Sequence, residues 1–286
     1  SFLTSITRSV YDDLRMGSDG PDEYTRPDYS IRQNDTDVIV TNDDPDVQVF
    51  TGYDQWNGMQ KISFQPNQWT NATYAFHYSK TSNYPRYDRL ILREDGALSN
   101  AEWYYGPQKW MMHSLNFTWS KPSAWFDQTK FTLALQDYEE SRHNRGIGNS
   151  RRTDRTEKVK AFSANLDLDK QLGDMLTVYY GAEFITNKVT SIGTRENISS
   201  GEVEPTSTRY PDGSDWRTYA GYVSLKIKPN QNWVINLSNR FTNVYTHSIY
   251  DQTFFDFPFT EATLKNKSVN GSLGVIFSPA ATWKLY

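Results

Sequence analysis

Apolar and polar residues alternate along most of this chain with a period of two, and no helical period is sustained over several turns. In residues 176–184, for example, the apolar residues Leu176 and Val178 occupy even positions, whereas the polar residues Thr177 and Glu183 occupy odd positions. Successive side chains of a β-strand point to opposite faces of its sheet, so this pattern predicts strands with one apolar and one polar face. Comparable segments lie at residues 72–79, 111–119, 131–136, 162–169, 218–227, 233–242 and 268–277, with weaker ones at 2–15 and 48–65 and a short one at 283–286. Together they predict roughly eleven strands.

The connections between these strands alternate strictly between short and long. The short ones are Pro66-Asn67 and residues 120–127, 170–174, 229–232 and 279–282. The long, polar ones are at about 16–47, 81–108, 142–155, 187–214 and 246–260. Outer-membrane β-barrels have tight turns on one side of the membrane and long loops on the other. The alternation therefore predicts an antiparallel transmembrane barrel wall rather than a compact soluble domain.

The tryptophans agree with that interpretation. Five of the nine lie within a few residues of a short turn, namely Trp69, Trp119, Trp125, Trp233 and Trp283. Aromatic girdles mark membrane interfaces, so these residues predict a rim at the short-turn end.

Composition first conflicts with a membrane protein and then supports one. Mean hydropathy is −0.74 and only 37% of residues are hydrophobic, yet 15% are aromatic. A barrel reconciles these values because only alternate strand residues face lipid, while its loops are polar. No run approaches the roughly 18 apolar residues of a membrane-spanning helix. The N-terminal residues 1–8 lack a signal-peptide pattern, so we expect any leader to lie outside this sequence.

Other features exclude whole classes of chemistry. The chain has no cysteine, which excludes disulfides, thiolate metal sites and a cysteine nucleophile. A formal charge of −4 gives no electrostatic reason to expect a nucleic-acid partner.

The alternation also predicts which residues face lipid. On the outside of one curved sheet we expect Phe76, Phe131, Leu166, Val178, Leu225, Leu237 and Val275. On the concave side we expect Thr132, Asn165, Glu183, Ser224, Asn236 and Asn270. A one-residue slip in register would invert every assignment in a strand.

Several stretches occur in an order that resembles the middle of the barrel in TonB-dependent outer-membrane receptors, particularly those of the Bacteroidetes type. The stretches are residues 48–57 (QVFTGYDQWN), 82–90 (SNYPRYDRL), 101–108 (AEWYYGPQ), 139–145 (EESRHNR) and 208–214 (TRYPDGS). The resemblance covers nearly the whole chain. The second and third stretches look most like the haem and haemoglobin receptor branch.

The resemblance implies a 22-stranded barrel filled by an N-terminal plug domain, through which the TonB protein acts. We therefore interpret residues 1–286 as a partial barrel domain, with the plug and the remaining strands absent. About eleven strands make half such a barrel, so we expect an open sheet with unpaired edges near residues 2–15 and 268–286.

No catalytic constellation and no metal site stand out in the sequence. Arginines and one histidine gather in the segment 142–155: Arg142, His143, Arg145, Arg151, Arg152 and Arg155. Guanidinium groups suit the carboxylates of a ferric chelate or of haem, although lipopolysaccharide phosphates and the acidic segment 16–47 are alternative partners. His143 is a candidate axial haem ligand. An aromatic group, Trp103, Tyr104, Tyr105 and Trp110, would stack on a flat ligand or pack against the rim.

These observations predict an outer-membrane receptor that takes up an iron source, haem or a ferric siderophore. Its partners would be outer-membrane lipid, TonB, and an iron-containing small molecule or haem protein, and it would not be an enzyme. Two alternatives remain open at this point: a complete small outer-membrane barrel acting as a protease or lipase, and a soluble β-rich carbohydrate-binding module.

Overall fold

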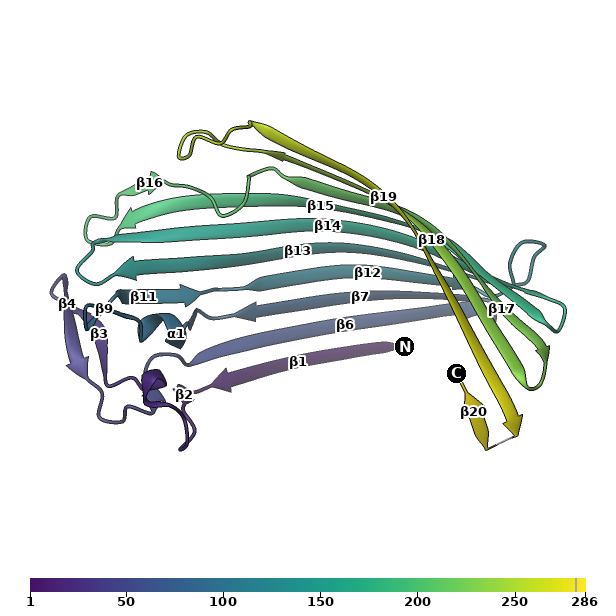
Figure 1. Ribbon diagram of the computed structural model, residues 1–286, viewed down its shortest axis with the longest axis horizontal. Helices are drawn as coiled ribbons and strands as arrows, with labels where there is room; N and C mark the ends of the chain where they lie inside the picture. Colours follow the sequence, from purple (N-terminus) through teal and green to yellow (C-terminus); the bar gives the residue numbers. More distant parts are fainter. Residues whose placement is uncertain (281) are drawn as a thin grey trace.

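The computed structural model describes residues 1–280 and 282–286, and most of them lie in one large antiparallel sheet. Eleven strands form its wall, in the order β1-β6-β7-β12-β13-β14-β15-β17-β18-β19-β20. Figure 1 shows them as a curved wall, with β3, β4, β9, α1 and β16 gathered at one end. In the described part of the chain, no helix is long and apolar enough to cross a membrane.

The wall strands are β1 (Phe2–Tyr11), β6 (Tyr53–Asn67), β7 (Thr70–Thr81), β12 (Lys109–Trp119), β13 (Gln128–Gly146), β14 (Arg151–Leu172), β15 (Leu176–Asn197), β17 (Asp215–Asn230), β18 (Trp233–Ile249), β19 (Glu261–Ala280) and β20 (Trp283–Leu285). The remaining elements are β2 (Leu14–Arg15), η1 (Asp22–Tyr24), β3 (Asp28–Gln33), β4 (Thr36–Thr41), β5 (Val47–Gln48), β8 (Tyr84–Pro85), α1 (Tyr87–Leu90), β9 (Arg93–Glu94), β10 (Ala97–Leu98), β11 (Asn100–Tyr105) and β16 (Val203–Pro205).

The register places the predicted lipid-facing residues on one face of the sheet. Residues directly opposite each other on paired strands share a face. Val178 lies opposite Leu225, and Leu225 opposite Leu237. Phe131 lies opposite Leu166. The register of the intervening strands places the other predicted residues on the same face, because each is an even number of positions along its strand from a direct partner of this set. The orientation prediction is confirmed.

Contacts on the other face show that it is concave. Side chains converge on the inside of a curved sheet and can then reach past a neighbouring strand. The Tyr222 hydroxyl donates to Asp167 at 2.7 Å, although β15 lies between β17 and β14. The Arg240 guanidinium donates to Glu183 at 2.5 Å across β17. The apolar residues therefore occupy the convex face and the polar ones the concave face.

The strands are longer than a bilayer requires. About 9–11 residues of a tilted strand cross the hydrocarbon, but β14 and β15 have 22 residues each. On the convex face of β14, Phe162 and Leu166 are followed toward the long-loop end by Lys160 and Lys158. The apolar band ends there, and the strands continue beyond it.

Two predicted long loops are therefore wrong in their bounds. The segment predicted as a loop at 142–155 is a continuation of β13 and β14, joined by a turn at residues 147–150. The segment 187–214 begins with the last eleven residues of β15, up to Asn197, and contains β16. Beyond the apolar band both faces of a strand are polar, so the alternation that predicts strands fades while the backbone ladder continues. The segment 16–47 likewise contains a hairpin, β3–β4.

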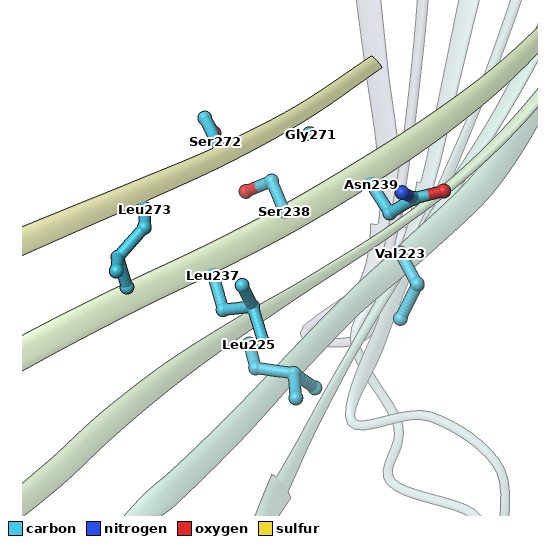
Figure 2. A pocket seen from close by; sticks show the side chains of 8 residues that line it. All are labelled: Val223, Leu225, Leu237, Ser238, Asn239, Gly271, Ser272 and Leu273. Atoms are coloured by element: carbon cyan, nitrogen blue, oxygen red, sulfur yellow. The ribbon is translucent and has the colours of Figure 1, made fainter. Parts of the chain in front are cut away.

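The five tryptophans predicted to form a rim all lie at the short-turn end, each 37% exposed or more. Above them the lipid-facing surface is uneven. A groove of about 470 Å³ lies between β17, β18 and β19, where Gly271 contributes no side chain. Leu225, Leu237 and Leu273 lie along it (Figure 2).

The two ends of the wall are β1 and β20. Within residues 1–280 and 282–286, no pairing joins β1 to β19 or β20, so the wall forms an open sheet as predicted.

Candidate ligand-binding site at the long-loop end

The structure divides the nine predicted site residues between the two faces of the sheet. Alternation along each strand divides them, and a one-residue insertion at residues 106–108 decides which of them share a face, because Tyr105 lies opposite Arg142 while Lys109 lies opposite Glu139. Odd-numbered residues of β11 therefore face the concave side, whereas those of β12 face lipid. Gly106 permits the bulge: its φ is +99°, and a Cβ there would lie 2.8 Å from the Ser82 carbonyl oxygen.

The concave group consists of Trp103, Tyr105 and Arg142, joined by Arg86. The two ring planes meet edge to face, with centroids 5.1 Å apart. The Arg142 guanidinium lies 5.1 Å from the Tyr105 ring and 5.4 Å from the Trp103 ring. Arg86 lies 5.3 Å from each ring, and both arginines donate to the Tyr105 hydroxyl at 3.0 Å. Two cations thus stack on a shared aromatic platform.

Arg142 differs from Arg86 in forming no ion pair with the described residues. Asp88 forms an ion pair with Arg86 at 2.5 Å. Among the described residues, Arg142 forms no ion pair, and its Nε is buried without a hydrogen-bond partner. Directly opposite on β14 lies Arg155, which donates to the carbonyl oxygen of Ser207 at 3.1 Å and to no described carboxylate. Two neighbouring cations are therefore available for an anion.

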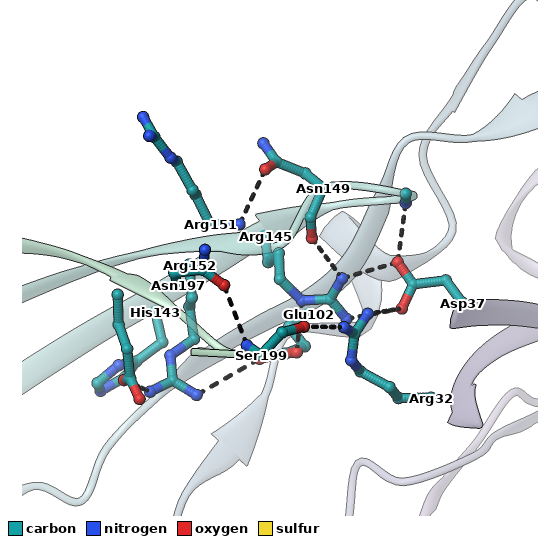
Figure 3. A network of polar contacts seen from close by, with 12 residues as sticks. Arg32, Asp37, Glu102, His143, Arg145, Asn149, Arg151, Arg152, Asn197 and Ser199 are labelled. Carbon is teal, nitrogen blue, oxygen red and sulfur yellow. Dashed lines mark hydrogen bonds and ion pairs between the residues drawn. The ribbon is translucent and has the colours of Figure 1, made fainter. Parts of the chain in front are cut away.

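The convex group is centred on Arg145, whose side chain is only 2% exposed. It donates to the carboxylate of Asp37 at 2.7 and 2.9 Å and to Glu102 at 2.7 Å (Figure 3). Burial alone would raise the pKa of the Asp37 carboxyl, but hydrogen bonds from Arg145 and the Gly148 amide outweigh it and lower that pKa. This network fastens the β3–β4 hairpin to the β13–β14 turn.

Tyr104, His143 and Arg152 continue the convex group. The Tyr104 ring stacks on the His143 ring with centroids 4.5 Å apart. His143 Nδ1 forms a short contact with Asp154, and Arg152 pairs with Asp154 at 2.9 Å and with Glu196 at 2.5 Å. These groups satisfy one another.

The last two predicted residues lie apart from both groups. Trp110 faces the concave side lower on the wall, where its indole N–H donates to Gln136 at 3.1 Å. Arg151 is exposed and pairs with Glu204 at 3.3 Å.

A second concave feature was missed by the sequence analysis. A cavity of about 400 Å³ is bounded by Tyr138, Glu140, Glu157 and the segment 210–214, among others. Glu157 is 3% exposed, accepts one long hydrogen bond from Ser191 at 3.5 Å, and lies opposite Glu140. Burial raises the pKa of the Glu157 carboxyl, and the neighbouring Glu140 charge adds to the effect. The sequence gives no signal for Glu157, because an acidic residue in a polar segment is expected to be exposed to water.

Arg209 contacts two residues that line this cavity. It donates to Glu140 at 3.0 Å and stacks on Tyr210, 5.0 Å from its ring. The segment around residues 207–212 therefore folds inward over the concave face. Within the described residues, no group of three or more His, Asp or Glu side chains is placed to hold a metal ion.

Comparisons with known proteins bear on the fold. No family model matches the sequence, and no curated protein matches it. Among solved structures, the copper transporter OprC has a TM-score of 0.71 at 10% identity, covering 98% of this chain and 39% of its own. The ferric yersiniabactin uptake receptor FyuA from Yersinia pestis gives 0.66 at 12% identity, covering 99% and 41%. The Serratia marcescens hemophore receptor HasR gives 0.53 at 10% identity, covering 81% and 35%.

The chain spans about two-fifths of the length of the first two structures. Its curved antiparallel wall, apolar on the convex face and polar on the concave face, agrees with these likenesses. The chain has the fold of the barrel wall of TonB-dependent outer-membrane receptors.

Proposed function

We propose that this chain forms part of the wall of an outer-membrane receptor that takes up an iron source, haem or a ferric siderophore, with TonB as its energy-coupling partner. The fold and the apolar convex face support the outer-membrane assignment. The copper, ferric citrate and ferric yersiniabactin transporters that it resembles in fold support uptake of a scarce metal. The wall contributes binding groups to the lumen and performs no reaction.

One observation carries the ligand assignment: the unpaired cations Arg142 and Arg155 beside the aromatic platform of Trp103 and Tyr105. A catecholate chelate or a haem offers a flat π-system together with anionic oxygens. Guanidinium groups hydrogen-bond such oxygens in two-pronged geometry, and the rings stack on the plane. We assign ligand contact to this concave group, with Trp110 lower on the same face.

The convex group has a different role in this proposal. Tyr104, His143, Arg145 and Arg152 are engaged with one another or with carboxylates. They hold the loops in place, and Arg151 is a solvated surface residue. Asp154 engages only Nδ1 of His143, which is compatible with ligation through Nε2, but the ring lies on the convex side, on the opposite face from the Arg142 platform, so we do not assign it as an axial ligand.

The His143–Asp154 pair is also the arrangement that an outer-membrane protease would need. The ring is 16% exposed and stacks on Tyr104, and within the described residues no hydroxyl bonds its second nitrogen. We therefore favour a structural role for the pair.

The test is ligand titration of the full-length receptor carrying Arg142→Gln and Arg155→Gln together. Each lost charge-assisted hydrogen bond is worth about 1.5–3 kcal/mol, so affinity for the natural iron source should fall at least about tenfold. Haemin and a ferric catecholate chelate are the probes. Arg151→Gln, an exposed arginine four residues before Arg155, is the matched control and should leave affinity unchanged. Equal affinity of the double variant and the parent would exclude this site.

A further inference from the structure

On the convex face, basic residues follow directly after the apolar run of their strand on its long-loop side. Lys80 lies opposite Lys109, and Lys160 lies opposite Lys188. Arg217 and Lys265 both lie opposite Tyr245. The lysine belt comprises Arg8, Lys80, Lys109, Lys158, Lys160, Lys188, Arg217, Lys265 and Lys267.

Side-chain contacts confirm that these groups share the convex face. Lys109 and Lys158 both contact Glu139, at 2.9 and 3.0 Å, across adjacent strands. The Arg217 guanidinium and the Lys265 ammonium lie 5.8 and 5.9 Å from the Tyr245 ring.

Acidic residues neutralise only part of the belt. Asp54 pairs with Arg8 at 3.4 Å, and Asp215 with Arg217 at 3.4 Å. Five lysines are exposed and form no ion pair with any described residue: Lys80, Lys160, Lys188, Lys265 and Lys267. A row of unpaired like charges repels itself, so an arrangement of this kind calls for external anions.

The opposite border of the apolar band has no such belt. On the convex face at the short-turn end, the basic residue of the described strands is Lys170, and it pairs with Asp127 at 2.7 Å. The asymmetry distinguishes the two sides of the membrane. It is unlike a uniformly solvated surface, where both borders would carry mixed charges.

The belt also contains a hollow suited to a headgroup. A pocket of about 200 Å³ lies at the border and is lined by Lys109, Lys158 and Lys160 above Tyr78 and Met111, among others. Its lower wall is largely apolar, and its upper wall carries these three lysines together with the carboxylates Asp137 and Glu139, which leaves a net positive charge. This combination matches a lipid whose acyl chains lie against the sheet and whose phosphate lies at headgroup level.

We propose that the lysine belt binds the phosphate groups of the glycolipid in the outer leaflet of the outer membrane. The proposal rests on the outer-membrane location in the proposed function. Each basic residue near an anionic surface contributes about 1 kcal/mol. Lysine binds phosphate as a point charge, so a row of lysines along the lipid boundary tolerates lipids in varied positions.

The test uses the full-length receptor with Lys80, Lys160, Lys188 and Lys265 all changed to Gln. The receptor is placed in phosphatidylcholine vesicles, and binding of diphosphorylated lipid A is measured beside binding of its dephosphorylated form. The parent should bind the phosphorylated form more tightly than the dephosphorylated one. The variant should bind the phosphorylated form at least about tenfold more weakly than the parent does. The matched control changes four concave-face lysines, Lys61, Lys130, Lys226 and Lys228, to Gln and should behave as the parent.

Three outcomes would overturn the proposal: unchanged lipid A affinity in the variant, equal binding of the dephosphorylated form, or displacement of lipid A by equimolar inorganic phosphate. Iron-source titration of the same variant separates the two proposals. Loss of lipid A affinity with intact iron-source binding supports the belt, whereas failure of both binding assays in the parent would refute the receptor function itself.

Discussion

Arg142 and Arg145 lie three residues apart on β13, yet they have opposite environments. Arg145 is on the convex side, buried to 2% exposure between two carboxylates. Arg142 is on the concave side, stacked on Trp103 and Tyr105 with no described carboxylate partner. An odd spacing along a strand reverses the face, and the face determines what each guanidinium meets. The same residue type therefore holds the loops together in one place and remains free to bind in the other.

The first prediction concerns stability and has the largest expected effect. Arg145→Gln leaves the Asp37 carboxylate, 1% exposed, without its main partner. Breaking a buried pair in this way costs about 3–5 kcal/mol, so the Gly148 amide should exchange hydrogen at least about a hundredfold faster. Arg142→Gln is the control and should change that exchange by less than about tenfold, since Arg142 contacts Trp103 and Tyr105 on the other face and not Asp37. Equal hydrogen-exchange rates of the Gly148 amide in the two variants would contradict the different roles of the two arginines.

How much of the structure the sequence predicts depends on which faces of each strand segment contact water. Within the apolar band, one face is apolar and the other polar, so the alternation around Leu166 and Val178 identified strands, register and faces. Beyond the band, both faces are polar, and the extended part of β13 and β14 was mistaken for a loop.

The candidate site shows a second limit. Its residue types were predicted from composition, but their division between two groups was not. The insertion at residues 106–108 reverses the faces of Trp103 and Tyr105, and only the pairing with β13 reveals it. Arg86 was missed because its role depends on contacts between segments distant in sequence. The cluster of Arg145 with Asp37 joins residues 108 positions apart.

The second prediction tests the two faces with a pair of glycines lower on the wall. A Cβ on Gly181, on the concave face, would lie 2.3 Å from the Leu166 carbonyl oxygen and 2.7 Å from the Tyr222 ring. On the convex face, Gly221 has nothing nearer than 3.8 Å. Gly181→Ala should therefore lower the free energy of unfolding by about 1–3 kcal/mol through overpacking. Gly221→Ala should change it by less than about 1 kcal/mol, as measured by denaturant unfolding in detergent micelles. Equal effects would contradict the assignment of faces.

The third prediction compares two adjacent tyrosines. The Tyr105 hydroxyl accepts hydrogen bonds from Arg86 and Arg142 at 3.0 Å each. Tyr105→Phe removes about 0.5–1.5 kcal/mol per hydrogen bond and frees Arg142, so iron-source affinity should fall roughly three- to tenfold. The Tyr104 ring stacks on His143 on the other face, and Tyr104→Phe preserves that stack. Its affinity should equal the parent's; a loss as large as that of Tyr105→Phe would show that the ligand contacts the convex group.

The smallest effect concerns pH, and the two buried carboxyls should respond with opposite signs. The pKa of Asp37 is lowered in the folded protein, so its contribution to stability is present above its ordinary value of 3.8 and is lost as pH falls toward the lower folded value. The pKa of Glu157 is raised, so ionisation opposes folding and local stability falls as pH rises from 4.5 toward the raised value.

Hydrogen exchange, corrected for its intrinsic pH dependence, separates these two responses. The Gly148 amide donates to Asp37 at 2.8 Å and should lose protection on acidification below about pH 4. The Gly213 amide donates to the Val189 carbonyl oxygen at 3.0 Å, beside the Glu157 cavity, and should lose protection as pH rises above about 4.5. Glu157→Gln cannot ionise, so it should flatten the second profile and leave the first unchanged. Asp37→Asn should do the reverse. If either variant flattened both profiles, the two faces would be coupled, and the separation of Arg142 from Arg145 would not hold.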